Sequence, residues 1–296
     1  MCRLFGFRSV IPSQMHRSLL EADNAILHQS QVHSDGWGVA YFVGGAPHVI
    51  KSTSPAVEDR LFRRVSGILA SETVLAHIRK ATHGDLCITN AHPFQYGHWV
   101  FIHNGNMEGF EKLKGRLLKE VSPLLRRFIL GNTDSEVLFY TILTRLSRRI
   151  ELHRGGCCLA DLAAAVRESV AKVTEIIGPF HLQEDGPPEK TYLTFILTDG
   201  STMIAHQGGK PLYYSTYKSR CQERGSCPCF AFECENPTQS GYVNHLLFSS
   251  EPIRGENIWL RAKPGQLIGV DRNMKLEIFD TDAAVGSGRG EPCPPS

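Results

Sequence analysis

The 296-residue sequence lacks the features that mark membrane, secreted and nucleic-acid-binding proteins. No apolar run approaches the length of about 18 residues that suggests a membrane-spanning helix. Few apolar residues precede Pro12, and no small-residue cleavage site follows, so the start does not resemble a signal peptide. The formal net charge is only +2, without a long run of lysine and arginine, which argues against nucleic-acid binding. We therefore expect a cytoplasmic protein that engages neither a membrane nor a nucleic acid.

The sequence also gives little support for a metal centre. Its nine cysteines are an odd number without a secretion signal, which favours reduced thiols. Four of them share a loop but lack the paired C-x2-C spacing of structural zinc sites: Cys221, Cys227, Cys229 and Cys234. This loop is either a variable surface segment or a weak zinc candidate, and its role stays open. No two of the five histidines in the middle of the sequence have the i, i+4 spacing of a helical metal site: His77, His83, His92, His98 and His103. We expect no metal and no organic cofactor.

Hydrophobic periodicity predicts strands at both ends of the chain and helices between them. Strands are expected at 3–8, 37–43, 47–52, 73–79, 99–103 and, in a series of short segments, from 191 to 279. Helices are expected from Pro12-Ser13 onward and at 57–69, 106–120, 134–150 and 158–177. This order favours a layered α+β domain with two sheets and helices outside. We predict one domain over residues 2–280 and a disordered tail at 281–296, rich in glycine, proline and serine.

The second residue of the chain is a cysteine, in Met1-Cys2-Arg3-Leu4-Phe5-Gly6. If Met1 is removed, Cys2 carries both a thiol and a free α-amine. The amine can then take the thiol proton and return it to a leaving group, as an amino-terminal nucleophile requires. A chance cysteine in a first strand is the alternative, so the remaining motifs must decide.

Three further segments carry residues that would suit cleavage of a glutamine side-chain amide. Asn104-Gly105 could supply two donors to an oxyanion, although Asn-Gly is also a common turn. Arg79 offers a planar fork for the α-carboxylate, although a strand-end arginine is usually a surface ion pair. Asp134 could hold the α-ammonium, although aspartate before a helix is often an N-cap. Sequence separation alone does not show that these residues meet in space.

Five ordered motifs across residues 2–140 resemble the class II glutamine amidotransferases, the family with an amino-terminal nucleophile cysteine. They are Cys2-Arg3-Leu4-Phe5-Gly6, His77-Ile78-Arg79-Lys80-Ala81-Thr82-His83-Gly84, Asn90-Ala91-His92-Pro93-Phe94, His103-Asn104-Gly105 and Thr133-Asp134-Ser135-Glu136. Two more segments, Ser34-Asp35-Gly36-Trp37-Gly38 and Ser249-Ser250-Glu251-Pro252, resemble the stand-alone branch of that family, which includes hydrolases of γ-glutamyl bonds.

The resemblance implies a four-layer αββα fold of the Ntn-hydrolase type, with two antiparallel sheets between helices. It also implies a role for each matched position. Cys2 would be the nucleophile, and Asn104 and Gly105 the oxyanion hole. The substrate-binding residues would be Arg79, Thr82, His83 and Asp134, with Trp37 and Gly38 near the amino terminus of Cys2.

The resemblance leaves the fate of the released group open. The sequence has no room after residue 280 for the synthase domain that larger family members carry. The protein would therefore be a γ-glutamyl amidohydrolase acting on glutamine or a γ-glutamyl compound, or a catalytic subunit that passes ammonia to a separate synthase partner. A partner amidohydrolase and a homo-oligomer are further expectations that the sequence does not decide.

Two other functional classes remain as alternatives. One is a different amino-terminal nucleophile hydrolase that acts on acyl amides. Arg79 and Asp134 argue against it, because together they suit an amino-acid head with both charges. The other is a non-catalytic regulatory homologue, against which the intact Cys2, Asn104 and Gly105 weigh.

Overall fold

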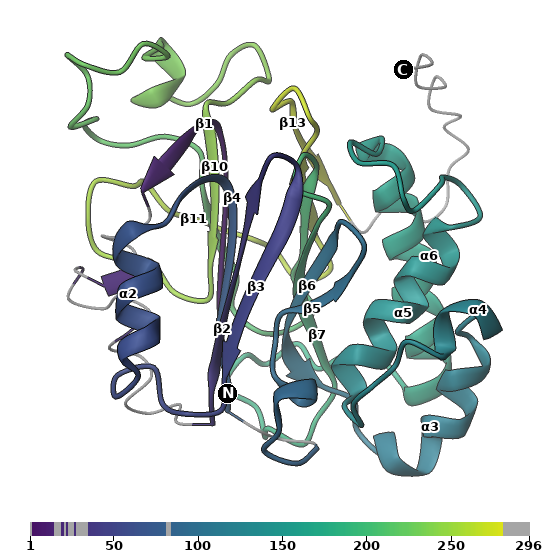
Figure 1. Cartoon of the computed structure of the whole chain (residues 1–296). Coiled ribbons are helices and arrows are strands. Elements are labelled where there is room, and N and C mark those ends of the chain that lie inside the picture. Colours follow the sequence, from purple (N-terminus) through teal and green to yellow (C-terminus); the bar gives the residue numbers. More distant parts are fainter. Residues whose placement is uncertain are drawn as a thin grey trace.

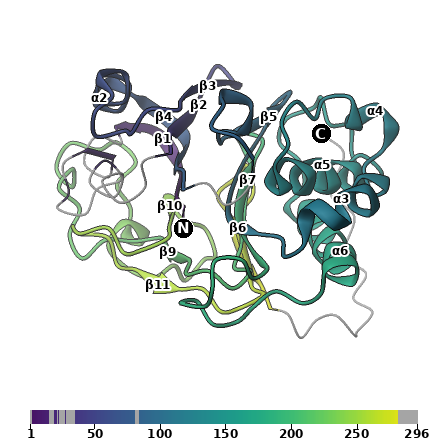
Figure 2. The same cartoon turned by 90° about the horizontal axis from the view of Figure 1, so that it is seen from below.

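The structure is a computed structural model that describes residues 2–14, 19–20, 22, 27, 35–80 and 84–280. Within these residues it contains two antiparallel sheets that lie face to face, with helices on both outer sides (Figure 1). Helix α2 covers one sheet, and helices α3 to α6 cover the other (Figures 1 and 2). The predicted four-layer αββα fold with two antiparallel sheets is therefore confirmed.

The first sheet has the strand order β11-β9-β10-β1-β4-β2-β3. Its strands are β1 (Arg3–Gln14), β2 (Trp37–Val43), β3 (Ala46–Ser52), β4 (Ala70–Ile78), β9 (Tyr213–Ser215), β10 (His245–Ser249) and β11 (Leu260–Arg261). The central strand β1 therefore joins segments from both ends of the chain, because β4 and β10 flank it.

The second sheet has the order β13-β12-β8-β7-β6-β5. Its strands are β5 (Phe94–Tyr96), β6 (Trp99–Asn106), β7 (Tyr192–Thr198), β8 (Met203–His206), β12 (Leu267–Val270) and β13 (Leu276–Phe279). The α-helices of the described residues include α2 (Arg60–Ile68), α3 (Phe110–Lys119), α4 (Pro123–Arg126), α5 (Asp134–Leu146) and α6 (Leu159–Ile177).

Strand β1 is longer than the sequence predicts. A helix was expected from Pro12-Ser13, but the strand continues to Gln14, and this expectation is wrong at its start. The pairing with β4 shifts register between Arg8 and Ser13 and then resumes, with Ser13 opposite Ser71. An irregularity of this kind lets a proline sit within a strand without breaking the sheet. The remainder of the expected helix falls largely outside the described residues.

Three buried clusters show which way each strand faces. One cluster contains Leu4 and Leu75 from the first sheet together with Ile102 and Ile196 from the second, so these side chains fill the space between the sheets. A second cluster lies between the first sheet and α2, and a third between the second sheet and α5 and α6. Since side chains alternate along a strand, these assignments fix the direction of neighbouring polar residues as well.

No helix in the described part of the chain is long and apolar enough to cross a membrane. The predicted tail at 281–296 falls outside the described residues, so the proposed division of the chain at residue 280 stays a prediction.

Candidate active site

Strand alternation directs four of the chemically important side chains into the same inter-sheet space. Cys2 lies two residues before the inward-facing Leu4, and Asn104 lies two residues after the inward-facing Ile102. His77 and Arg79 continue the inward face of β4 beyond Leu75. Polar residues thus replace the apolar filling at the end of the space where β1 begins.

The thiol of Cys2 lies against the end of β4. Its Sγ is 3.3 Å from both the carbonyl oxygen and the backbone N–H of Lys80. Burial raises the pKa of the Cys2 thiol, while the Lys80 N–H and the charge of Arg79 lower it and the charge of Asp134 raises it. The thiol therefore lies within electrostatic range of both proposed substrate anchors.

Arg79 is held from two sides by backbone groups. Its N–H donates to the carbonyl of Gly36 at 2.8 Å, and its own carbonyl accepts from Asp35 at 3.2 Å. The guanidinium is 3% exposed and donates to the carbonyls of Asp85 at 3.3 Å and Gly84 at 3.5 Å. These main-chain carbonyls hold the guanidinium in place.

Asn104 and Gly105 lie on β6 opposite β7. The Asn104 side chain is 2% exposed, and its Oδ1 has no hydrogen-bond partner among the described residues. A buried amide with an unsatisfied oxygen is unusual in a folded protein. Oδ1 accepts, so a ligand group that meets it must be a donor, whereas the oxyanion role requires the Nδ2 hydrogens of the same amide. A Cβ at Gly105 would lie 2.0 Å from the Tyr192 carbonyl and 2.2 Å from His103 Nε2, which explains the glycine.

Asp134 begins α5 and is 2% exposed. Its Oδ2 accepts from the Met107 N–H at 2.8 Å, and its Oδ1 accepts from the Ser135 N–H at 2.7 Å. The N-cap of α5 is Thr133, whose side chain accepts from the Glu136 N–H. Asp134 is therefore not the cap that its position before a helix suggested, and its carboxylate is instead joined to the residue that follows β6.

The structure places Trp37 and Gly38 close to the start of β1 but with different surroundings. Trp37 pairs with Ile78, which in turn pairs with Arg3. Its indole is fully buried against Phe62 under α2, so the side chain lines no accessible space here. Gly38 lies on the inward face, where a Cβ would come within 2.0 Å of the His92 carbonyl. The other two expected substrate residues, Thr82 and His83, lie outside the described residues.

Two histidines without an expected role, His77 and His92, lie beside this cluster, and His77 joins the two sheets. His77 Nε2 lies 3.1 Å from the carbonyl of His103, the residue before Asn104. The rings of His92 and His77 are in contact and tilted by 34°, with 4.1 Å between their centroids. Burial lowers the pKa of His92 well below its ordinary value, so the ring is neutral at pH 7. The sequence contained a signal for His77, because it lies two residues before Arg79 and therefore on the same face of the predicted strand.

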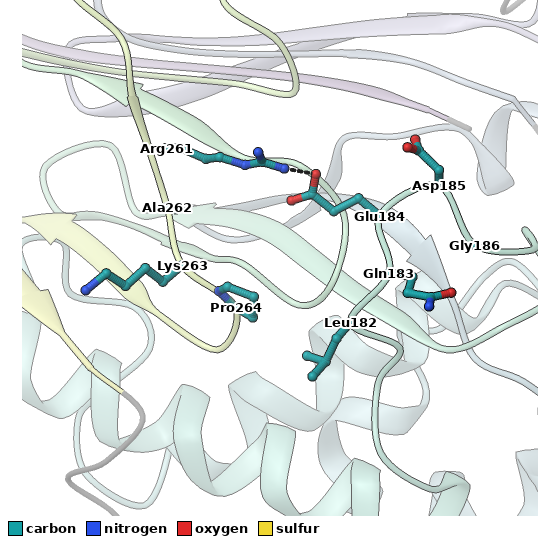
Figure 3. A pocket seen from close by; sticks show the side chains of 9 residues that line it. All are labelled: Leu182, Gln183, Glu184, Asp185, Gly186, Arg261, Ala262, Lys263 and Pro264. Carbon is teal, nitrogen blue, oxygen red and sulfur yellow. Dashed lines mark hydrogen bonds and ion pairs between the residues drawn. The ribbon is translucent and has the colours of Figure 1, made fainter.

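Two clefts among the described residues lie outside this cluster. One, of about 690 Å³, lies between residues 182–186 and 261–264 (Figure 3). An ion pair between Arg261 and Glu184 crosses it, whereas Lys263 points away from Glu184 (Figure 3). Arg261 lies three strands from β1, or about 14 Å at the usual strand spacing. Another cleft, of about 650 Å³, is lined by aromatic residues near α5. Neither is lined by Cys2, Arg79, Asn104 or Asp134.

The cysteine-rich loop contributes nothing to the cluster. Its four cysteines are free thiols, and the Asn244 amide donates to the Cys234 Sγ at 3.1 Å. The second donor to that sulfur is the Ala231 N–H at 3.5 Å. These contacts make Cys234 part of the packing of the loop, and the role of the loop stays open.

Comparison with known proteins identifies the family. The model of the class II glutamine amidotransferases matches residues 1–284. The chain belongs to this family. The roles expected of Cys2, Arg79, Asn104 and Asp134 within the family stay predictions.

Relatives and solved structures agree with the family. The chain is 28% identical over 224 residues to the yeast Saccharomyces cerevisiae protein "Probable glutamine amidotransferase DUG3", covering 69% of this chain and 62% of that protein. It is 39% identical over 75 residues to the γ-glutamyl-hercynylcysteine sulfoxide hydrolase of Mycobacterium tuberculosis, covering 25% of this chain and 32% of that enzyme. A glutamine aminotransferase class-II domain protein from Silicibacter pomeroyi has the same fold, with a TM-score of 0.60 and 20% identity over 94% of this chain and 98% of that one.

Proposed function

We propose that the protein is an Ntn-type cysteine amidohydrolase that cleaves the γ-amide of glutamine or of a γ-glutamyl compound through a thioester on Cys2. The observation that supports this best is the shared direction of Cys2, Arg79 and Asn104. Cys2 directly precedes β1, Arg79 directly follows β4 and Asn104 lies on β6. All three face one end of the inter-sheet space, and the charge of Asp134 acts on the same thiol. Family membership supports the same chemistry.

The two fixed charges suit the head of a free amino acid. Arg79 would pair with the α-carboxylate, since a guanidinium offers two parallel donors to a carboxylate. Asp134 would pair with the α-ammonium, because both carboxylate oxygens already accept one backbone N–H each and keep further acceptor capacity. A substrate held in this way would extend its γ-amide toward Cys2.

The reaction would proceed in two steps after removal of Met1. The α-amine of Cys2 takes the thiol proton, and the thiolate attacks the γ-carbonyl carbon. Asn104 and the Gly105 N–H stabilise the oxyanion, and the amine leaves with the proton that the α-amine returns. Water then hydrolyses the γ-glutamyl thioester and releases glutamate. Loss of one oxyanion donor is expected to lower the rate by about 10²- to 10³-fold.

The identity of the leaving group separates two versions of this function. Similarity to a mycobacterial γ-glutamyl hydrolase supports a γ-glutamyl compound as substrate, although it covers only 25% of the chain. A subunit that passes ammonia from glutamine to a separate synthase partner is the second version. The matched region spans 62% of the length of the yeast relative, so the similarity does not extend to the activity of that whole protein.

The test is a panel of glutamine and γ-glutamyl amides, with ammonia, free amine and glutamate measured separately. We expect glutamate from at least one member, and Cys2→Ala should abolish its release. Cys158→Ala is a matched control, because Cys158 is also a half-buried free cysteine but precedes α6. Full activity of Cys2→Ala with an unchanged fold would refute the proposed nucleophile.

A further inference from the structure

The imidazole of His103 joins the oxyanion strand to the first turn of α5. Its Nδ1 is 2.9 Å from the Ser135 Oγ, and its Nε2 is 3.1 Å from the Tyr192 carbonyl oxygen. The residue is 1% exposed. Burial lowers the pKa of His103, although the charge of Asp134 and the bond to Tyr192 raise it, so the ring is neutral at pH 7.

The partners of this ring determine where its single proton lies. A carbonyl oxygen can only accept, so Nε2 must carry the proton and donate to Tyr192. Nδ1 of the neutral ring is then an acceptor, and the only donor that Ser135 offers it is the hydroxyl. The Ser135 hydroxyl proton therefore points at His103.

This direction matters for Asp134, because Ser135 Oγ also lies 3.3 Å from Asp134 Oδ1. A serine hydroxyl has one proton, and His103 receives it. Asp134 Oδ1 is thus left with the Ser135 backbone N–H as its donor at 2.7 Å, and it keeps an acceptor position for another group. The ring and the hydroxyl together keep this carboxylate available to a cation.

We propose that Ser135 and His103 are positioning residues that set the preference for a substrate with an α-ammonium group. Without the hydroxyl, Nδ1 faces the region of Asp134 with no donor. The Ser135 hydroxyl donates to the neutral ring, so its loss makes protonation of Nδ1 easier, and the resulting imidazolium competes with the substrate ammonium for the carboxylate. This inference rests on the proposed role of Asp134 as the ammonium anchor.

The test compares two amides that differ only in the α-amino group, glutamine and glutaramate, by their ratio of kcat/KM. We expect wild-type protein to favour glutamine, and Asp134→Ala to remove that preference. Ser135→Ala should lower the ratio about tenfold, as expected when the charge-assisted hydrogen bond from the substrate ammonium to Asp134 is lost, chiefly through a higher KM for glutamine. The loss should be larger at low pH, where the imidazolium forms more readily. Ser135→Thr keeps the hydroxyl and should restore the ratio.

Two controls separate this effect from a general structural one. The amide 4-aminobutanamide lacks the α-carboxylate but keeps the amine, so the ratio of glutamine to this compound should not change in Ser135→Ala. Ser169→Ala removes an equally buried hydroxyl, which bonds the Ala165 carbonyl at 2.7 Å on α6, and should leave both ratios unchanged. If Ser135→Ala does not fold, Ser135→Cys keeps the shape with a weaker donor and should shift the ratio in the same direction.

The outcomes distinguish the inference from the function on which it rests. A wild-type preference that Asp134→Ala abolishes but Ser135→Ala and Ser135→Cys retain would overturn the inference alone. A wild-type protein that cleaves glutamine and glutaramate equally well would overturn the proposed role of Asp134. Equal loss against all three amides in Ser135→Ala would show a structural role and would also overturn the inference.

Discussion

Substitution of Gly105 by alanine probes the arrangement around the proposed oxyanion hole. The added Cβ would lie 2.0 Å from the Tyr192 carbonyl oxygen and 2.2 Å from His103 Nε2, far inside van der Waals contact. Neither neighbour is the end of a flexible chain, because one is backbone in β7 and the other is a ring bonded at both nitrogens. The strands or the ring must therefore move apart.

The expected cost follows from two contributions. Overpacking of a buried site costs about 1–3 kcal/mol. Loss of the His103–Tyr192 hydrogen bond adds about 1 kcal/mol. The free energy of unfolding should thus fall by about 2–4 kcal/mol, which corresponds to a decrease in Tm of about 4–16 °C for a large domain. A displacement of about 1 Å at the donors should also lower kcat by about 10²-fold.

Thermal unfolding and glutamate release measure these two effects on the same preparation. Gly115→Ala is the matched control, because Gly115 lies within α3 and its added Cβ meets nothing within 4 Å. That variant should be more stable by about 0.5–1 kcal/mol, since alanine favours a helix over glycine. A Gly105→Ala protein with wild-type Tm and kcat would refute the packing argument.

Four further outcomes are expected. Burial lowers the pKa of His206 to about 4, so its folded form resists protonation. The unfolded chain binds that proton below pH 6.5, so the free energy of unfolding should fall by about 3 kcal/mol between pH 6.5 and 4, at 1.36 kcal/mol per pH unit. Urea unfolding of wild type and His206→Gln at both pH values measures this change. An equal dependence of the free energy of unfolding on pH in the two proteins would contradict it. Protein that retains Met1 should be alkylated at Cys2 only above the ordinary pKa of a cysteine thiol, because burial raises the pKa of the Cys2 thiol. Iodoacetamide labelling at a series of pH values, followed by peptide mapping, measures this, and rapid alkylation of Cys2 at lower pH would contradict it. Asp59→Ala should lower stability by about 1–2 kcal/mol, because Asp59 caps α2 and accepts the Trp37 indole N–H at 3.0 Å; an unchanged Tm would contradict the cap. Arg261→Gln should change stability by less than about 1 kcal/mol, because the ion pair with Glu184 is exposed on the arginine side; a Tm decrease above that of Asp59→Ala would contradict this.

The layered fold was predictable because segments with the two-residue period of strands and segments with the 3.6-residue period of helices are separate along the chain. The strands 37–43 and 99–103 and the helix that begins at Asp134 were all expected close to where they lie. Strands β5 and β11 were missed, since three and two residues are too short to show a period. The extension of β1 through Pro12 was missed as well, because its pairing with Ala70 and Ser71 is made across more than 50 residues.

The site was predictable in its members but not in its connections. Alternation alone could have directed Cys2, Arg79 and Asn104 to one space once the pairing of β1 with β4 and the packing of the second sheet, with β6, against them were known. The bond from Met107 to Asp134 spans 27 residues, and that from His103 to Ser135 spans 32. Both bonds depend on how α5 packs against β6, and this packing cannot be predicted from the local sequence pattern.

Covalent labelling by a glutamine analogue tests the central claim most directly. The protein is treated with 6-diazo-5-oxo-norleucine, and the labelled residue is located by mass spectrometry of the intact chain and its amino-terminal peptide. We predict one adduct on Cys2 of chains that lack Met1, and excess glutamine should protect Cys2 from labelling. An adduct on another cysteine, or unlabelled Cys2 in a preparation that cleaves glutamine, would contradict it.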